Sequence, residues 1–89
     1  MKKTVQTLDM QNAVLSLTYF LSEHYLQEID KHIYSLNLIE FDSRTGKETV
    51  MTAPEITCDE KQAYDFMQAC ADTFVTSSDF FDVVDDFIG

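Results

Sequence analysis

The chain has 89 residues, of which 45% are hydrophobic, and its formal net charge is −10 at neutral pH. A chain of this length fits a single domain, residues 1–89, that buries about 60 to 65% of the surface exposed by the unfolded chain. Seven Phe and four Tyr are too many apolar side chains for a disordered tail. The charge opposes direct binding to nucleic acid, because attraction to phosphates dominates that affinity.

The apolar runs of the sequence are too short for a membrane span. Two lysines near the start suit a signal peptide, but polar residues interrupt any apolar segment behind them. A run of 18 apolar residues occurs nowhere in the sequence. We therefore expect a soluble, cytoplasmic protein, in the host cytoplasm if a phage encodes it. Cys58 and Cys70 do not form a CxxC pattern, and we expect both to be reduced thiols.

Residues 8 to 36 place apolar side chains at steps of three or four, which is typical of an amphipathic helix. The pattern consists of Met10, Val14, Leu17, Leu21, Tyr25, Ile29, Ile33 and Leu36. Asp9 is suited to cap the start of this helix. The segment from residue 32 onward is rich in β-forming residues, so we expect a long N-terminal helix that ends near residue 31.

The middle of the chain predicts an antiparallel β-hairpin. Residues from about 33 to 42 are expected to pair with residues from about 47 to 53 across the turn-rich segment DSRTGKE, in which Gly46 can adopt a positive φ. Pro54 is expected to end the second strand. Two strands alone make a marginal sheet, so the hairpin must pack on helices or pair with another chain, which leaves a homodimer open.

Two helices are predicted after the hairpin. Thr57 and Glu60 have the spacing of a capping box, and apolar residues then follow at helical spacing. These residues are Ala63, Phe66 or Met67, Cys70 and Phe74. A Thr-Ser-Ser segment interrupts the pattern and supplies a new cap, so residues 79–88 are expected to form a third, short helix. The predicted fold class is therefore α+β, a small single domain with the order α-β-β-α-α.

The negative charge is concentrated in the C-terminal half. Up to Lys47 there are five bases and six acids, whereas the remainder has ten acids and one base, Lys61. Six acids follow Lys61 without a compensating base: Asp65, Asp72, Asp79, Asp82, Asp85 and Asp86. At 100° per residue, three of the last four lie within about 60° of one another on the third helix. The opposite arc carries Phe80, Phe81, Val84, Phe87 and Ile88. We expect this apolar arc to dock on the core and to turn the aspartates outward.

Such a row has two interpretations. A solvated face would keep a small protein soluble. However, like charges at steps of three and four repel by a few tenths of a kcal/mol, and mixed charges would give solubility without that repulsion. Carboxylates at these steps rise about 4.5 to 6 Å along a helix, comparable to the spacing of phosphates. The row therefore suggests binding to a groove lined with Lys and Arg.

Other candidate sites are weaker. His24, Glu28 and His32 could share a helix face as metal ligands, but they leave the coordination shell incomplete. Acids beside Cys58 disfavour a reactive thiolate, and Asp82, Asp85 and Asp86 lack the glycine spacing of a calcium loop. Phosphate-binding, dinucleotide-binding and hydrolase motifs do not occur in the sequence. We expect neither an enzyme nor a bound metal or cofactor.

The sequence therefore suggests a small acidic inhibitor that mimics nucleic-acid phosphates and occupies the basic groove of a nuclease or polymerase. In composition alone, the chain resembles the DNA-mimic inhibitors by which phages and mobile elements block restriction or CRISPR nucleases. The six aspartates that follow Lys61 are the predicted partner-binding residues. Two alternatives remain: a neutralising partner of the antitoxin or immunity type, and a structural dimerisation module.

Overall fold

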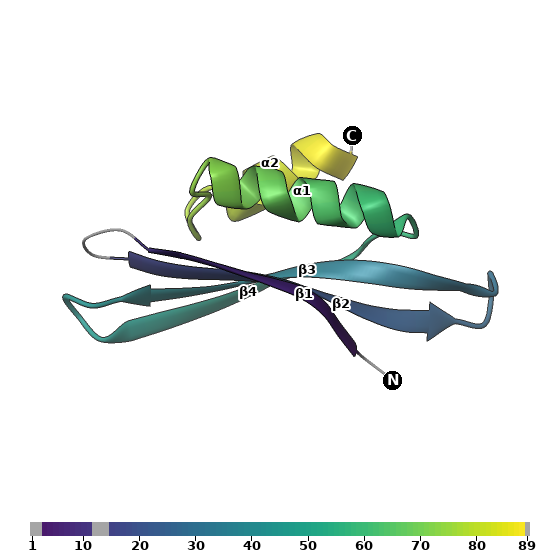
Figure 1. The fold of residues 1–89 in the computed structure, drawn as a ribbon, viewed down its shortest axis with the longest axis horizontal. Coiled ribbons are helices and arrows are strands. Elements are labelled where there is room, and N and C mark those ends of the chain that lie inside the picture. The colour runs from purple at the N-terminus through teal and green to yellow at the C-terminus, as the bar shows by residue number, and fades with distance from the viewer. Residues whose placement is uncertain (1–2, 12–14, 89) are drawn as a thin grey trace.

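A computed structural model describes residues 3–11 and 15–88 of the protein. Four strands precede two helices: β1 (Lys3–Gln11), β2 (Leu15–Leu26), β3 (Lys31–Asp42), β4 (Lys47–Thr57), α1 (Glu60–Asp72) and α2 (Phe80–Ile88). The strands form one antiparallel sheet in the order β1-β2-β3-β4. Figure 1 shows both helices on one side of this twisted sheet, while the other side carries no helix.

The predicted order α-β-β-α-α is wrong, because strands β1 and β2 replace the long N-terminal helix. Leu17, Tyr19 and Leu21 alternate along β2 and are all buried, which is the period of a strand with one covered face. Asp9 pairs with Thr18 across β1 and β2 and so does not cap a helix. Val14, another member of the predicted pattern, lies outside the described residues.

The predicted hairpin occurs at the expected turn, but as the last two strands of a four-stranded sheet. Gly46 has a φ of 72° in this turn, and Phe41 pairs with Glu48 just beyond it. Pro54 does not end β4, which continues to Thr57 through a register shift. At this bulge Glu55 has a φ of 53°, and its N–H donates to Ser35 Oγ at 3.0 Å.

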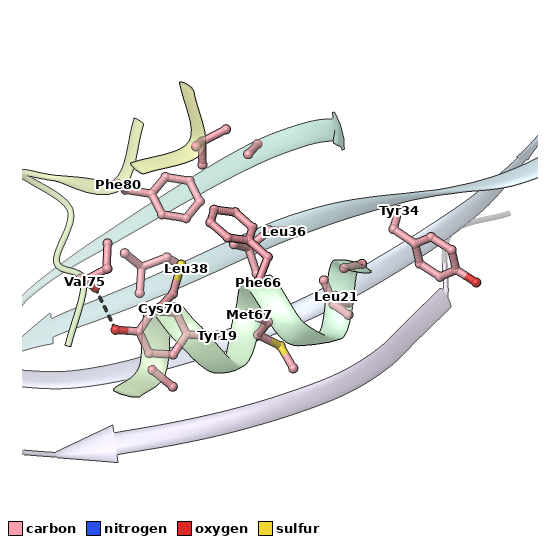
Figure 2. Close-up of a cluster of buried hydrophobic side chains, with 14 of the residues drawn as sticks. Tyr19, Leu21, Tyr34, Leu36, Leu38, Phe66, Met67, Cys70, Val75 and Phe80 are labelled. Carbon is pink, nitrogen blue, oxygen red and sulfur yellow. Dashed lines mark hydrogen bonds between the residues drawn. The ribbon is translucent and has the colours of Figure 1, made fainter. Parts of the chain in front are cut away.

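The hydrophobic core lies between the sheet and the helices (Figure 2). The sheet contributes alternate residues of its three last strands: Leu17, Tyr19, Leu21, Tyr34, Leu36, Leu38 and Ala53. The helical layer contributes Ala63, Phe66, Met67, Cys70, Ala71, Val75, Phe80 and Val84. Cys70 is buried here and Cys58 is exposed, and both are free thiols. The helices within the described residues do not combine the length and apolar character needed to cross a membrane.

Specific polar contacts fix the helices on the sheet. The N-cap of α1 is Asp59, which accepts from Gln62 N–H at 3.1 Å, so the predicted capping box of Thr57 and Glu60 is wrong. In the loop between the helices, the Tyr19 hydroxyl donates to the Val75 carbonyl at 2.7 Å. Glu40 on β3 accepts from both the N–H and the hydroxyl of Ser77, each at 2.9 Å. These contacts place the start of α2 relative to the sheet.

Candidate functional site: the acidic helical surface

Helix α2 docks through a narrow stripe of side chains. Phe80 is 0% exposed, Val84 is 4% exposed, and Val83 and Phe87 are partly buried against the core. These residues stand at positions i, i+3, i+4 and i+7, the spacing of one helix face. The ring of Phe87 stacks on Phe66 of α1 with centroids 4.2 Å apart, which joins the two helices.

Phe81 and Ile88 were expected in the docked arc, and this prediction is wrong. Phe81 is 50% exposed and Ile88 is 60% exposed. Each follows a docked residue by one position and is therefore rotated by about 100° from it, beyond the edge of the contact with the sheet and α1. The Phe81 ring retains an edge contact with Phe80, with centroids 5.4 Å apart.

The predicted aspartates of α2 all face solvent. Asp79, Asp82, Asp85 and Asp86 are exposed, and the backbone carbonyl of Asp79 accepts the first helical hydrogen bond, from Val83 N–H at 3.0 Å. Negative charge is favourable in the first turn, where Asp82 lies, and unfavourable near the C-terminus, where Asp85 and Asp86 lie. The last turn of α2 contains no basic residue that would offset it.

The two aspartates of α1 are also exposed but are less free than those of α2. Asp65 forms an ion pair with Lys61 at 2.8 Å, and this contact raises the pKa of Lys61. Asp72 accepts a hydrogen bond from the Gln68 amide at 3.0 Å. The six aspartates thus lie on the helical side of the molecule, with the strongest uncompensated charge on α2. We call them together the acidic helical surface.

Exposed apolar side chains accompany these carboxylates. Phe81 and Ile88 lie on α2 beside Asp85, and Tyr64 of α1 and Phe74 after it are 39% and 43% exposed. Phe74 has a φ of 52°, a conformation that is uncommon for an aromatic residue. The helical side of the molecule therefore presents exposed apolar side chains together with the carboxylates of the acidic helical surface. Spacing in the sequence does not separate Phe81 from Phe80, because Phe81, Val84 and Ile88 also recur at helical steps of three and four.

The other candidate sites are dispersed by the fold. The helix face that would have joined His24, Glu28 and His32 does not exist, because these residues lie on β2, in the turn after it, and on β3. His24 instead contacts Glu55 at 3.1 Å, and His32 packs edgewise on Tyr25 with centroids 5.5 Å apart. Over the described residues there is no group of three His, Cys, Asp or Glu side chains arranged to hold a metal ion.

The thiol of one core cysteine and the hydroxyls of two core tyrosines are held in their neutral form. Burial raises the pKa of Cys70 to about 11. Burial, together with a hydrogen bond to Glu23, raises the pKa of Tyr34 to about 12. Burial also raises the pKa of Tyr19, whose hydroxyl is committed to Val75. At neutral pH these three groups are structural donors and core side chains, not nucleophiles.

A family model, described as a family of unknown function (DUF6514), matches residues 1–89. The chain belongs to this family. No curated protein and no solved structure matches it. In this member of DUF6514, the acidic helical surface is therefore the feature of the structure that points to a function.

Proposed function

We propose that the protein is a small cytoplasmic inhibitor that binds the basic groove of a nucleic-acid-handling protein. The carboxylates of the acidic helical surface would occupy the positions of phosphates in that groove. The observation that carries this proposal is the exposure of Asp79, Asp82, Asp85 and Asp86 on a helix that Phe80 and Val84 anchor. An anchored helix holds its charges at fixed spacing, which a groove can match.

The spacing along α2 supports the proposal. A rise of about 1.5 Å per residue places Asp82 about 4.5 Å beyond Asp79 and Asp86 about 6 Å beyond Asp82. The side chains of these three residues leave the helix within about 60° of one another, so they form one row. A row of exposed charges of one sign attracts lysine and arginine from a distance and raises the rate of association.

Phe81 and Ile88, which lie beside Asp85 on α2, indicate what kind of groove a partner would offer. A purely electrostatic contact would leave Phe81 and Ile88 in water, whereas an interface with an apolar centre and a charged rim would bury them. Aromatic residues carry a large share of binding energy when they fill a pocket. We therefore propose a groove in which lysines or arginines flank an apolar pocket, of the kind that receives a base beside its phosphates.

A neutralising partner of the antitoxin or immunity type would use the same surface against a basic protein that does not bind nucleic acid. Both functions require the charges of α2, so removal of these charges alone does not separate them. Competition does. Duplex DNA or RNA would displace the protein from a groove that handles nucleic acid, and it would leave a complex with another basic target intact.

The test compares two variants with the same net charge. Asp79, Asp82, Asp85 and Asp86 are replaced by asparagine in the first, and the exposed acids Glu28, Asp30, Glu48 and Glu55 by their amides in the second. Each variant has a net charge of −6 in place of −10. Wild-type protein and both variants are immobilised and exposed to the heparin-binding fraction of a lysate from the source organism, which is enriched in basic groove proteins.

We expect wild type and the second variant to retain the same target and the first variant to lose it. With the purified target, the first variant should bind at least about tenfold more weakly and with a shallower salt dependence. Circular dichroism checks that both variants are folded. Equal retention of the target by the two variants would mean that α2 is only a solvated face. Failure of nucleic acid to compete would favour the antitoxin alternative.

A further inference from the structure

The side of the sheet opposite the helices, which we call the open face, carries large apolar residues. Ile39 of β3 lies between Thr18 of β2 and Val50 of β4 in the register. Phe20 and Phe41 have the same orientation, one row away on either side. Val50 is 59% exposed and Phe41 is 40% exposed. A solvated face of an antiparallel sheet is normally polar, so this group indicates a contact surface.

The polar residues at the centre of the open face are already satisfied. Asn37 is only 3% exposed, and its amide donates to Ser22 Oγ and to the Phe20 carbonyl, both at 3.2 Å. The Thr52 hydroxyl donates to the Asn37 carbonyl oxygen at 2.9 Å. Over the described residues, no buried side-chain polar atom lacks a partner. Covering the open face would therefore leave these donors and acceptors paired, which avoids the main cost of burying polar groups.

Charge decides what can cover this face. Two rows of residues in register cross the middle of the open face: Thr18, Ile39 and Val50 form one, and Phe20, Asn37 and Thr52 form the other. None of these six side chains is an acid or a base. The helical side carries six aspartates, so two copies would repel if they met there. A two-fold contact places identical patches against each other, which requires a patch that does not repel itself. In a chain of charge −10, the two central rows of the open face meet that requirement, and Glu48, in register with Phe41, lies outside them.

We propose that two copies of the protein pair through their open faces to form a two-layer sandwich of sheets. Strands β2, β3 and β4, of 11 or 12 residues each, span about 40 Å and are together about 15 Å wide, giving at most roughly 600 Å² per copy. The total of about 1,200 Å² is at the lower end of stable interfaces. The exposed large apolar residues of the open face, Phe41 and Val50, lie on β3 and β4, so the contact is centred on these two strands. We therefore expect a weak and reversible dimer.

The acidic helical surface stays exposed on both outer sides of such a dimer. The pairing is thus independent of the proposed inhibitor function and would present two copies of the acidic row. It also has the opposite dependence on salt. Added salt screens the repulsion between two chains of charge −10 and strengthens the dimer, whereas it weakens binding of the aspartates to a basic groove.

Sedimentation equilibrium of the full chain at low micromolar to millimolar concentration tests the proposal. The average mass of the wild type should rise from 10.2 kDa toward twice that value, and it should rise at lower concentration when sodium chloride is added. Val50→Asp places a like charge on the contact face of both copies and should weaken the dimer at least about tenfold. Val50→Thr, which keeps the branched shape suited to a strand, should weaken it to a smaller extent.

Ile88→Asp is the matched control, because Ile88 is as exposed as Val50 but lies on α2. This variant should keep the dissociation constant of the wild type. In addition, methyl resonances of Ile39 and Val50 should shift on dilution while those of Ile88 stay fixed. A chain that remains monomeric at millimolar concentration would overturn the proposal. So would a dimer that Ile88→Asp weakens as much as Val50→Asp does.

Discussion

Replacing Phe80 with alanine tests how α2 is held. Phe80 is 0% exposed and points into the core cluster (Figure 2), and Phe→Ala substitutions in such positions cost about 3 to 5 kcal/mol. Phe81 is 50% exposed, so Phe81→Ala forfeits roughly half of the 1.5 to 3 kcal/mol that full burial contributes. We therefore expect the free energy of unfolding to fall by at least about 1.5 kcal/mol more for Phe80→Ala than for Phe81→Ala.

Urea titration followed by far-ultraviolet circular dichroism measures both losses. A small domain has about 5 to 15 kcal/mol of stability in total, so Phe80→Ala should move the midpoint to much lower urea while the slope stays unchanged. Phe81→Ala is the control, since it removes the same atoms from the next position on the helix. Equal losses for the two variants would refute the docking of α2 through Phe80, and the aspartate row would then have no fixed geometry.

Four further outcomes are expected. Tyr19→Phe leaves the buried Val75 carbonyl without its donor and should cost about 1 to 3 kcal/mol in the same titration, with exposed Tyr64→Phe as the control. A thiol reagent should modify exposed Cys58 in the native protein and Cys70 only after unfolding, and two fast-reacting thiols would contradict the placement of Cys70 in the core. Burial raises the Cys70 pKa from 9.0 to about 11, so the free energy of unfolding should be unaffected by this thiol below pH 9 and should fall as the pH rises to about 11; Cys70→Ala should flatten that decline. Moderate sodium chloride should raise the melting temperature of the dilute protein by screening the aspartates, and a flat response in both sodium and potassium chloride would show that the acidic helical surface carries no strain.

The N-terminal half shows why its fold could not be predicted from apolar spacing alone. A helix step of four is also two strand steps, so Leu17, Leu21 and Tyr25 fit both periods. Tyr19 distinguishes them, because it is buried with Leu17 and Leu21 on one side of β2. The turn after β2 contains neither glycine nor proline, and Asp30 supplies its positive φ of 54°. The sequence signal for a break was therefore weak.

The C-terminal helices were predictable because their apolar steps of three do not fit a strand. Ala63 and Phe66 are separated by such a step, Cys70 follows four residues later, and all three are buried along α1. The exposure of the aspartates also followed from the pattern. The ion pair of Lys61 with Asp65 was not predicted, although a separation of four residues is typical of such pairs on a helix. Whether Phe80 or Phe81 is buried depends on how α2 is rotated against the sheet. The contacts that set this rotation are distant in sequence: Tyr19 and Val75 are 56 positions apart, and Glu40 and Ser77 are 37 positions apart.

The apolar composition of the open face could not be predicted from the sequence for a related reason. Phe20, Ile39 and Val50 become neighbours only when β2, β3 and β4 are placed in register, and the predicted helix removed β2 from the sheet. With β2 absent, Asn37 lacked the two acceptors that β2 provides, the Phe20 carbonyl and the Ser22 hydroxyl. The open face therefore depends on tertiary pairing, and single-segment patterns do not reveal it.

The bulge in β4 limits how large an assembly of this protein can become. A sheet grows into a fibre when each added chain offers one edge to bind and a second edge to extend. β4 is an edge strand of the described sheet, but Pro54 has no N–H to donate and the Glu55 N–H is turned inward to Ser35. The edge is interrupted at these two residues, so a foreign strand cannot pair along its whole length. Growth of the sheet through the β4 edge is therefore hindered at these two residues, which opposes chain-to-chain extension into a fibre.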